Sequence, residues 1–489
     1  MRRVIGIIGA GFGGLSAAVL LAARGHRVEV FDKQNRPGGK AAGIEINGFH
    51  FDSGPSVITS PWLFDEIFEK AGRKREDYIH LIPIHPWTRI IETNESWWDL
   101  DDPDLMNEDG VLITREEINQ LSVFNENART IFRRWQENYY NVTMNNTRDW
   151  IRSLVRLPEI RHLSDDYRLI ASMLPNDRIR HAIAFPAVVL GANPFTPTRA
   201  PLIYHGMKCQ GGVYYPQGGI SALANSLVRI IRELGGEVHY GVEVSEILYH
   251  NGRLRGIRLN DGGVQVCDYV ISTSDALLSS KDLLPGFARH FKSEVNKKRL
   301  ATSAFVLGLG IRELPELELL KPFNIIQGYG FAEFMKSVFQ TGKLSTDPFF
   351  FVNSPSQIDP SLAPAGHSLL QVVTPVPNLT YPLDWVESTR LIRKQLVDKL
   401  EQLFPGLRNA VVAEISYGPP DFRDRLNCYA GAAFSLQPIF TPTGWRTIKQ
   451  QVDGYPEVFL VGAGTHPGGG IFGVIHSAFN VDRIITNRI

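Results

Sequence analysis

The chain has 489 residues with 51 basic and 51 acidic side chains, so its formal net charge is zero. This balance argues against a nucleic-acid partner and against strong attraction to anionic lipid, and the length allows two or three domains with a substantial core. The three cysteines, Cys209, Cys267 and Cys428, lack the spacing of a metal or redox motif, so we expect a reduced, cytoplasmic protein without a metal site.

The first predicted element is an apolar strand at 4–8 that leads into a glycine-rich turn. Gly9, Gly11 and Gly14 follow it in the pattern G-x-G-x-x-G. In a nucleotide-binding turn, the first glycine allows the tight bend, the second lets the backbone approach a pyrophosphate, and the third lets helix pack on strand. The alternative is a tight strand–helix turn with no nucleotide.

The next helix and strand complete a dinucleotide-binding unit. Leu15, Ala18 and Ala22 share one face of a helix, a strand is expected at 28–31, and Asp32 ends that strand. An acidic residue at this offset accepts hydrogen bonds from an adenosine ribose. The free N–H groups at the helix N-terminus favour the pyrophosphate anion.

Two further glycine-rich loops distinguish a flavin from a nicotinamide. Residues 36–40 (Arg-Pro-Gly-Gly-Lys) follow the second strand, and residues 51–55 (Phe-Asp-Ser-Gly-Pro) come one hairpin later. Loops so close to the ribose imply an extended ligand that is seldom released, which favours a resident FAD over a dissociating nicotinamide. Taken alone, the glycine pair at 38–39 is typical of an ordinary turn.

The middle of the chain predicts a discontinuous domain. Longer, more polar helices begin after residue 75, and nucleotide-binding features resume at 214. Ser221 is expected to cap a helix that ends at Gly235, with strands at 237–240, 242–249 and 254–259. We expect an FAD-binding domain of residues 1–75, 214–290 and 446–489, and a substrate-binding, membrane-facing region of residues 76–213 and 291–445.

No segment reaches the roughly 18 uninterrupted apolar residues of a transmembrane helix. The nearest is 182–190, which Pro186 interrupts. Two interpretations stay open for this segment: a core helix, or a lipid-facing surface of the substrate region.

The carboxyl-terminal end carries a second strand–glycine loop–helix unit. An apolar strand at 458–461 precedes the loop 462–470, and a helix is expected from about Gly473. The dipole of that helix would stabilise negative charge on the pyrimidine side of a reduced flavin. The alternative is a glycine loop that only packs against another domain.

Together these segments resemble the bacterial and fungal phytoene desaturase family, which are FAD-dependent carotenoid desaturases related to amine oxidases. The resemblance covers essentially the whole chain and rests on residues 9–14, 32, 36–40, 51–60, 190–195, 212–219, 421–424 and 462–477. The Gly-Thr-His-Pro-Gly run at 464–468 is the most family-specific part. Two positions depart from the family pattern: Asp32 stands where glutamate is commoner, and Phe472 stands where a proline is common beside the flavin.

The resemblance implies an α/β fold: a discontinuous, Rossmann-like, amine-oxidase-like FAD-binding domain, an α+β substrate-binding domain and a helical membrane-facing region. It also implies a set of FAD-binding residues drawn from all the glycine-rich loops and from the strand that meets the adenine. These residues are Gly9, Gly11, Phe12, Gly14, Asp32, Lys33, Gly39, Lys40, Gly54, Pro55, Ser56, Val244, Gly464, Thr465, Ile471, Gly473 and Val474.

The reaction implied is FAD-dependent desaturation of a carotenoid precursor, with phytoene favoured, by hydride transfer to the flavin. The alternatives are a desaturase of a hydroxylated carotenoid or a C30 polyene, an amine oxidase on the same fold, and a non-enzymatic prenyl-lipid escort protein. A lipophilic polyene implies peripheral attachment to a membrane surface. The electron acceptor, oxygen or a quinone, stays open.

Few charged residues are candidates for catalysis. Asp149 and Arg152 lie three residues apart on a helix expected from Thr147, so they share a face and are predicted to assist an allylic cation or a proton transfer. The alternative is a solvated ion pair. His466, in the last glycine loop, is expected either to act at the flavin or to satisfy local backbone groups.

Overall fold

The computed structural model describes residues 2–92, 96–102, 113–143, 147–157, 164–278, 283–284, 300–439 and 448–488. Six described strands form a mainly parallel sheet in the order β19 (Gln451–Val452), β20 (Tyr455–Leu460), β13 (Tyr269–Ser272), β1 (Val4–Ile8), β2 (Arg27–Asp32) and β9 (Glu237–Tyr240). β1 pairs in parallel with both β2 and β13, so the carboxyl ends of these strands meet at one edge of the sheet. Each segment predicted for the FAD-binding domain contributes two strands, and the domain boundaries stay a prediction.

Three helices are associated with this sheet: α1 (Phe12–Ala23), α8 (Ile220–Glu233) and α15 (Gly470–Thr486). α1 contacts both α8 and α15 and is buried from Phe12 to Ala22. A helix covered on all sides needs an apolar sequence all round, which explains why α1 is so rich in alanine and leucine.

The prediction that Ser221 caps α8 is wrong. The N-cap is Gly219, two residues earlier, and the Ile220 N–H donates to Oδ1 of Asp52 at 2.9 Å. Asp52 ends β4 (Phe49–Asp52), so a carboxylate far away in the sequence satisfies the start of this helix.

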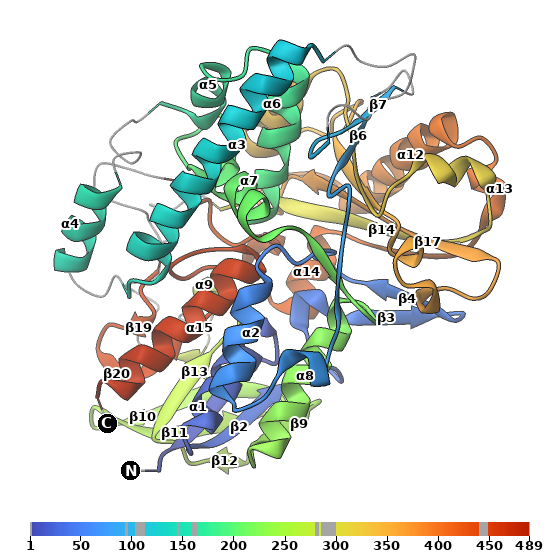
Figure 1. Cartoon of the computed structure of the whole chain (residues 1–489). Coiled ribbons are helices and arrows are strands. Elements are labelled where there is room, and N and C mark those ends of the chain that lie inside the picture. Colours follow the sequence, from blue (N-terminus) through green and yellow to red (C-terminus); the bar gives the residue numbers. More distant parts are fainter. Residues whose placement is uncertain are drawn as a thin grey trace.

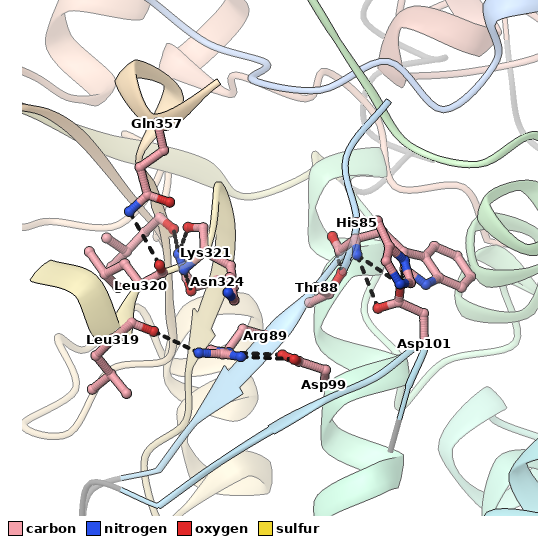
Figure 2. A network of polar contacts seen from close by, with 12 residues as sticks. His85, Thr88, Arg89, Asp99, Asp101, Leu319, Leu320, Lys321, Asn324 and Gln357 are labelled. Atoms are coloured by element: carbon pink, nitrogen blue, oxygen red, sulfur yellow. Dashed lines mark hydrogen bonds and ion pairs between the residues drawn. The ribbon is translucent and has the colours of Figure 1, made fainter. Parts of the chain in front are cut away.

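Seven described strands form the second sheet in the order β18 (Val411–Tyr417), β14 (Ser303–Arg312), β17 (His367–Val376), β16 (Phe350–Asn353), β15 (Phe323–Ile326), β6 (Arg89–Ile91) and β7 (Trp97–Asp99). A buried ion pair joins its last two strands: Nε and Nη2 of Arg89 each lie 2.8 Å from an oxygen of Asp99 (Figure 2). Arg89 also donates to the carbonyl oxygen of Leu319 at 3.0 Å, which anchors this edge of the sheet.

The remaining described strands form three smaller groups. They are β10 (Val244–His250), β11 (Arg253–Leu259) and β12 (Val264–Gln265); the hairpin β3 (Gly43–Ile46) with β4; and the pair β5 (Leu81–Pro83) with β8 (Tyr214–Pro216). The β5–β8 pair is antiparallel and joins residues on either side of the predicted domain boundary at 214.

Helices α3, α5, α6 and α7 gather at the end of the molecule opposite the first sheet, α12 and α13 flank the second sheet, and α4 lies at the outer edge (Figure 1). The bounds of the remaining described helices are α2 (Pro61–Lys70), α3 (Arg115–Trp135), α4 (Thr147–Arg156), α5 (Asp166–Ala171), α6 (Asp177–Ala184), α7 (Ala200–Gly211), α9 (Ala276–Leu278), α11 (Phe331–Lys336), α12 (Trp385–Leu403), α13 (Leu407–Ala410) and α14 (Pro419–Leu426). Among the described helices, none combines the length and apolar character needed to cross a bilayer.

The lipid-facing interpretation of segment 182–190 is wrong. Ala182 to Ala184 end α6, a short 3₁₀ helix (Phe185–Leu190) follows, and the side chains from Ala182 to Val188 are buried. Residues 182–188 pack in the core because the helices around them cover their side chains. The last two residues of the segment, Val189 and Leu190, line an internal cavity.

Candidate active site

Residues of both large sheets line one cavity of about 720 Å³. Part of it borders the glycine loop between β1 and α1 and the amino-terminal turn of α15. Another part borders strands β14, β15, β16 and β17 of the second sheet. The cavity therefore brings together the two glycine-rich ends of the chain and the predicted substrate-binding region.

The three glycines of the first loop have three different physical roles. Gly9 has a φ of 102°, and a Cβ there would lie 2.4 Å from Oγ1 of Thr273. A Cβ at Gly14 would lie 2.1 Å from the carbonyl oxygen of Gly9. Gly11 lines the cavity, and a Cβ there would meet nothing within 4 Å. The space in front of Gly11 is therefore open to a ligand.

Asp32 joins the end of β2 to this loop. Its carboxylate accepts hydrogen bonds from the backbone N–H of Ala10 at 2.6 Å and of Gln34 at 2.7 Å. Burial raises the pKa of Asp32, although these two bonds act in the opposite direction. The residue also lines the cavity, so it stands where the predicted ribose contact requires an acceptor.

Two helix N-termini face the same cavity. α1 follows Gly11, α15 follows Gly469, and no side chain caps either helix. α15 begins three residues before the predicted start, and Gly470, Ile471 and Val474 of its first turns line the cavity. Uncapped N–H groups and the helix dipole stabilise negative charge, so the cavity has two sites suited to an anionic or electron-rich ligand.

The part of the cavity formed by the second sheet and helix α7 carries no charge on its described lining residues. Tyr204 and Asn353 are its polar side chains. The others that these elements contribute are Met207, Ala304, Val306, Phe323, Phe351 and Val373, and Val189, Leu190 and Phe434 add apolar lining from other segments. The charged lining residues Asp32, Lys33, Lys40, Glu243, Asp275 and Arg425 come from segments other than the second sheet and α7.

Comparison with known proteins decides the family. The model of the flavin-containing amine oxidoreductases matches residues 12–483. A lycopene-forming phytoene desaturase of Pseudescherichia vulneris is 33% identical over 98% of each chain. A zeta-carotene-forming phytoene desaturase of Myxococcus xanthus is 31% identical over 100% of this chain and 94% of its own. The chain belongs to the carotenoid desaturase family of flavin-containing amine oxidoreductases.

The fold agrees with this membership. An oxidoreductase from Methanosarcina mazei has the same fold, with a TM-score of 0.63 at 19% identity over 98% of this chain and 100% of that one. As a family member, the protein is an FAD-dependent oxidoreductase. The open space at Gly11, the acceptor at Asp32 and the two uncapped helix N-termini fit this cofactor.

Most of the predicted FAD-binding residues line the cavity, and three do not. Those that do are Gly9, Gly11, Phe12, Asp32, Lys33, Gly39, Lys40, Gly54, Pro55, Ser56, Val244, Gly464, Ile471 and Val474. Gly14, Thr465 and Gly473 support the loops instead. Thr465 Oγ1 donates to the carbonyl oxygen of Gly462 at 2.9 Å, and a Cβ at Gly473 would lie 2.4 Å from the carbonyl oxygen of Gly468.

Sequence reasoning missed the residues that follow β13. Thr273, Ser274 and Asp275 line the cavity, and Oγ1 of Thr273 donates to the carbonyl oxygens of Ile8 at 3.0 Å and Gly9 at 3.1 Å. A polar run directly after an apolar strand was the available signal, because ligands bind at the carboxyl ends of parallel strands.

The structure does not bring Asp149 and Arg152 to the cavity. Both lie on α4, outside the described cavity lining, and Arg152 is exposed. Asp149 accepts a hydrogen bond from the Thr143 hydroxyl at 3.4 Å. The catalytic role of this pair stays a prediction, and no contact within the described cavity supports it.

His466 contacts backbone carbonyl groups and is not among the described residues that line the cavity. It is buried, and its Nε2 lies 2.8 Å from the carbonyl oxygen of Val142 and 3.1 Å from that of Tyr139. Burial lowers its pKa to about 4, with the two carbonyl contacts opposing the shift. A neutral ring that donates from Nε2 thus ties the last glycine loop to the segment after α3.

Proposed function

We propose that this protein desaturates a carotenoid precursor, with phytoene as the first candidate. The observation that carries the proposal is the uncharged, mainly apolar part of the cavity beside the second sheet. Transfer of a C40 hydrocarbon into water costs on the order of 30 kcal/mol, at about 0.8 kcal/mol per carbon. An apolar wall of this kind shields such a chain from water, whereas a protonated amine would be left there without a carboxylate partner.

The same proposal includes a position for each part of the FAD in the cavity. The diphosphate would lie against the open face of Gly11 at the start of α1, the adenosine ribose near Asp32, and the adenine near Val244. The flavin ring would lie between the 54–56 loop and the first turn of α15, where Ile471 and Val474 line the cavity. When bound, FAD accepts the hydride from the substrate.

The side chains of this protein then have positioning roles. Phe351 and Val373, which pair across β16 and β17, would present an apolar surface to the polyene beside the 54–56 loop. The uncapped N–H groups of α15 would stabilise negative charge as it develops on the ring system.

Incubation of the purified protein with liposomes that contain single polyenes tests the reaction. C40 phytoene should give products whose absorption moves to longer wavelength as conjugation grows. C30 and hydroxylated polyenes in the same vesicles rank the substrate classes. Absence of a coloured product from every polyene would contradict the proposal.

We also propose that α4 attaches the protein to a membrane surface from one side. Ile151 and Val155 lie one turn apart on α4 and are 55% and 63% exposed. Arg148, Arg152 and Arg156 are exposed and recur every four residues along the same helix. Exposed apolar residues beside a row of arginines suit the interface between acyl chains and anionic headgroups.

Flotation with liposomes tests this attachment. Replacing both Ile151 and Val155 with aspartate should reduce co-flotation with vesicles that contain phosphatidylserine. Val386 and Leu391 on α12 are also exposed, at 68% and 41%, and provide a matched control. An equal loss after Val386→Asp with Leu391→Asp would show that α4 has no special role.

A further inference from the structure

Residues 425–435 form a strap along the cavity. The first four and the last three residues of this strap line the cavity. At its start, Nε2 of Gln34 donates to the carbonyl oxygen of Arg425 at 2.8 Å, just after the strand that carries the predicted ribose acceptor. At its end, a Cβ at Gly464 would lie 2.7 Å from Oγ of Ser435. The strap therefore extends from the ribose side to the flavin side of the proposed FAD position.

Two lysines hold the strap against the nucleotide-binding part of the molecule. Nζ of Lys33 donates to Oδ1 of Asn427 at 2.7 Å. Nζ of Lys40 donates to the carbonyl oxygen of Ala433 at 2.7 Å. With the bond at the start of the strap, these contacts tie it to the segment that follows β2 at three points.

The backbone of the strap adopts a conformation that its own residues do not favour. Asn427, Ala430 and Ser435 have φ values of 51°, 48° and 63°, in the left-handed region that residues with a Cβ rarely adopt. Such residues persist only where the surrounding structure imposes them, and they cluster at ligand clamps. The rest of the molecule therefore holds the strap in its place along the cavity.

Three of the described lining residues are cations, and Arg425 differs from the other two. Lys33 and Lys40 already use Nζ to hold the strap. The side chain of Arg425 is exposed, and its guanidinium has no hydrogen bond or ion pair with any described residue. Within the described part of the chain, this guanidinium is the lining cation that stays available to an anion in the cavity.

Arg425 also lies close to the proposed position of the diphosphate. Gly39 and Arg425 both line the large cavity and a second, small one of about 30 Å³ beside it. A Cβ at Gly39 would lie 3.3 Å from Cα of Gly11. Gly39 therefore connects the region of Arg425 to the open face of Gly11, against which the diphosphate is proposed to lie.

We propose that the guanidinium of Arg425 binds the diphosphate of FAD. A planar guanidinium presents two parallel N–H groups that match the oxygens of a phosphate. Asp32, Glu243 and Asp275 bring carboxylates to the same lining, so this cation would also offset their repulsion of the diphosphate. With Arg425 on one side and the first glycine loop on the other, the strap closes the cofactor into the cavity. This role rests on the FAD position given by the proposed function.

Two variants on α14 test the role of this arginine. Arg425→Met removes the guanidinium and keeps an unbranched side chain. Arg423→Met is the matched control, because Arg423 is exposed on the same helix and lies outside the described cavity lining. Its guanidinium pairs instead with the carboxylate of Asp424, at 2.6 Å and 2.9 Å.

Binding is measured by calorimetric titration of the apoprotein with FAD, ADP and adenosine. ADP carries the diphosphate without the flavin, and adenosine carries neither. Arg425→Met should weaken the binding of FAD and of ADP at least tenfold, or about 1.4 kcal/mol, because a charge-assisted contact is lost. Adenosine should keep its affinity within twofold. A merely structural role of Arg425 would not separate ADP from adenosine in this way.

Arg423→Met should leave all three affinities within twofold of the wild type. A loss of less than tenfold for ADP in Arg425→Met, or an equal loss for adenosine or in Arg423→Met, would overturn the proposal. If Arg425→Met does not fold, Arg425→Gln is measured in the same way and decides by the same limits. Absence of turnover with every polyene would contradict the proposed function alone, because ADP binding requires neither flavin nor polyene.

Discussion

The glycines of the first loop allow cofactor binding to be separated from folding. Gly11 has φ −74° and ψ 172°, an extended conformation that any residue adopts, and a Cβ there meets no atom within 4 Å. Gly11→Val should therefore fold, at a cost of about 1 kcal/mol for a poor residue at a helix N-cap. Its side chain would occupy the space where the diphosphate of FAD is proposed to lie.

The expected loss of affinity is large. A hydrogen bond from a backbone N–H to a charged group contributes about 1.5–3 kcal/mol. Losing two of them would weaken FAD binding by about two to four orders of magnitude. Purified Gly11→Val protein should be colourless, with the ratio of flavin absorbance to protein absorbance after gel filtration near zero.

Gly14→Ala provides the contrast. Its Cβ would lie 2.1 Å from the carbonyl oxygen of Gly9, and moving backbone apart in a packed turn costs typically 1–3 kcal/mol or more. Thermal unfolding followed by circular dichroism, without added FAD, should show a larger loss for Gly14→Ala than for Gly11→Val. Full flavin content in Gly11→Val, or an equal loss of stability in both variants, would refute the assignment of this loop.

Two further predictions concern charged groups. Burial raises the pKa of Asp52 to about 6 from an ordinary value of 3.8, against hydrogen bonds from Tyr215 and Ile220. The folded state then holds a proton that the unfolded state releases, so this group should lower the free energy of unfolding by about 2 kcal/mol as pH rises from 4 to 6, out of about 3 kcal/mol over its whole titration. Denaturant unfolding of Asp52→Asn should lack that decrease, and identical pH profiles for both proteins would contradict it. If Asp149 and Arg152 act in catalysis, replacing either with alanine should slow flavin reduction more than tenfold, or about 1.4 kcal/mol. Unchanged stopped-flow rates would leave them as surface residues.

The local parts of the site were predictable from sequence. The strand at 4–8, the glycine loop and Asp32 lie within about thirty residues, and each position is fixed by a local requirement for a bend, a close approach or a packed helix. The structure has the strand at Val4–Ile8 as predicted. The loop at 462–470 was predictable for the same reason, although its helix begins earlier, at Gly470.

The long-range contacts were not predictable. The carboxylate at the start of α8 belongs to Asp52, 168 residues before Ile220, so the nearer Ser221 was the wrong choice. The Ser56–Asn353 contact spans 297 residues, and no pattern in either segment indicates the other. The burial of segment 182–190 was unpredictable for the same reason, because it depends on helices elsewhere in the chain.

The most direct test of the account is flavin reduction under anaerobic conditions. The FAD-loaded protein is mixed in a stopped-flow instrument with phytoene liposomes, with empty liposomes, and with a primary amine such as putrescine. The account predicts loss of oxidised-flavin absorbance with phytoene alone, together with a more conjugated polyene as product. Reduction by the amine with no reduction by any polyene would contradict it.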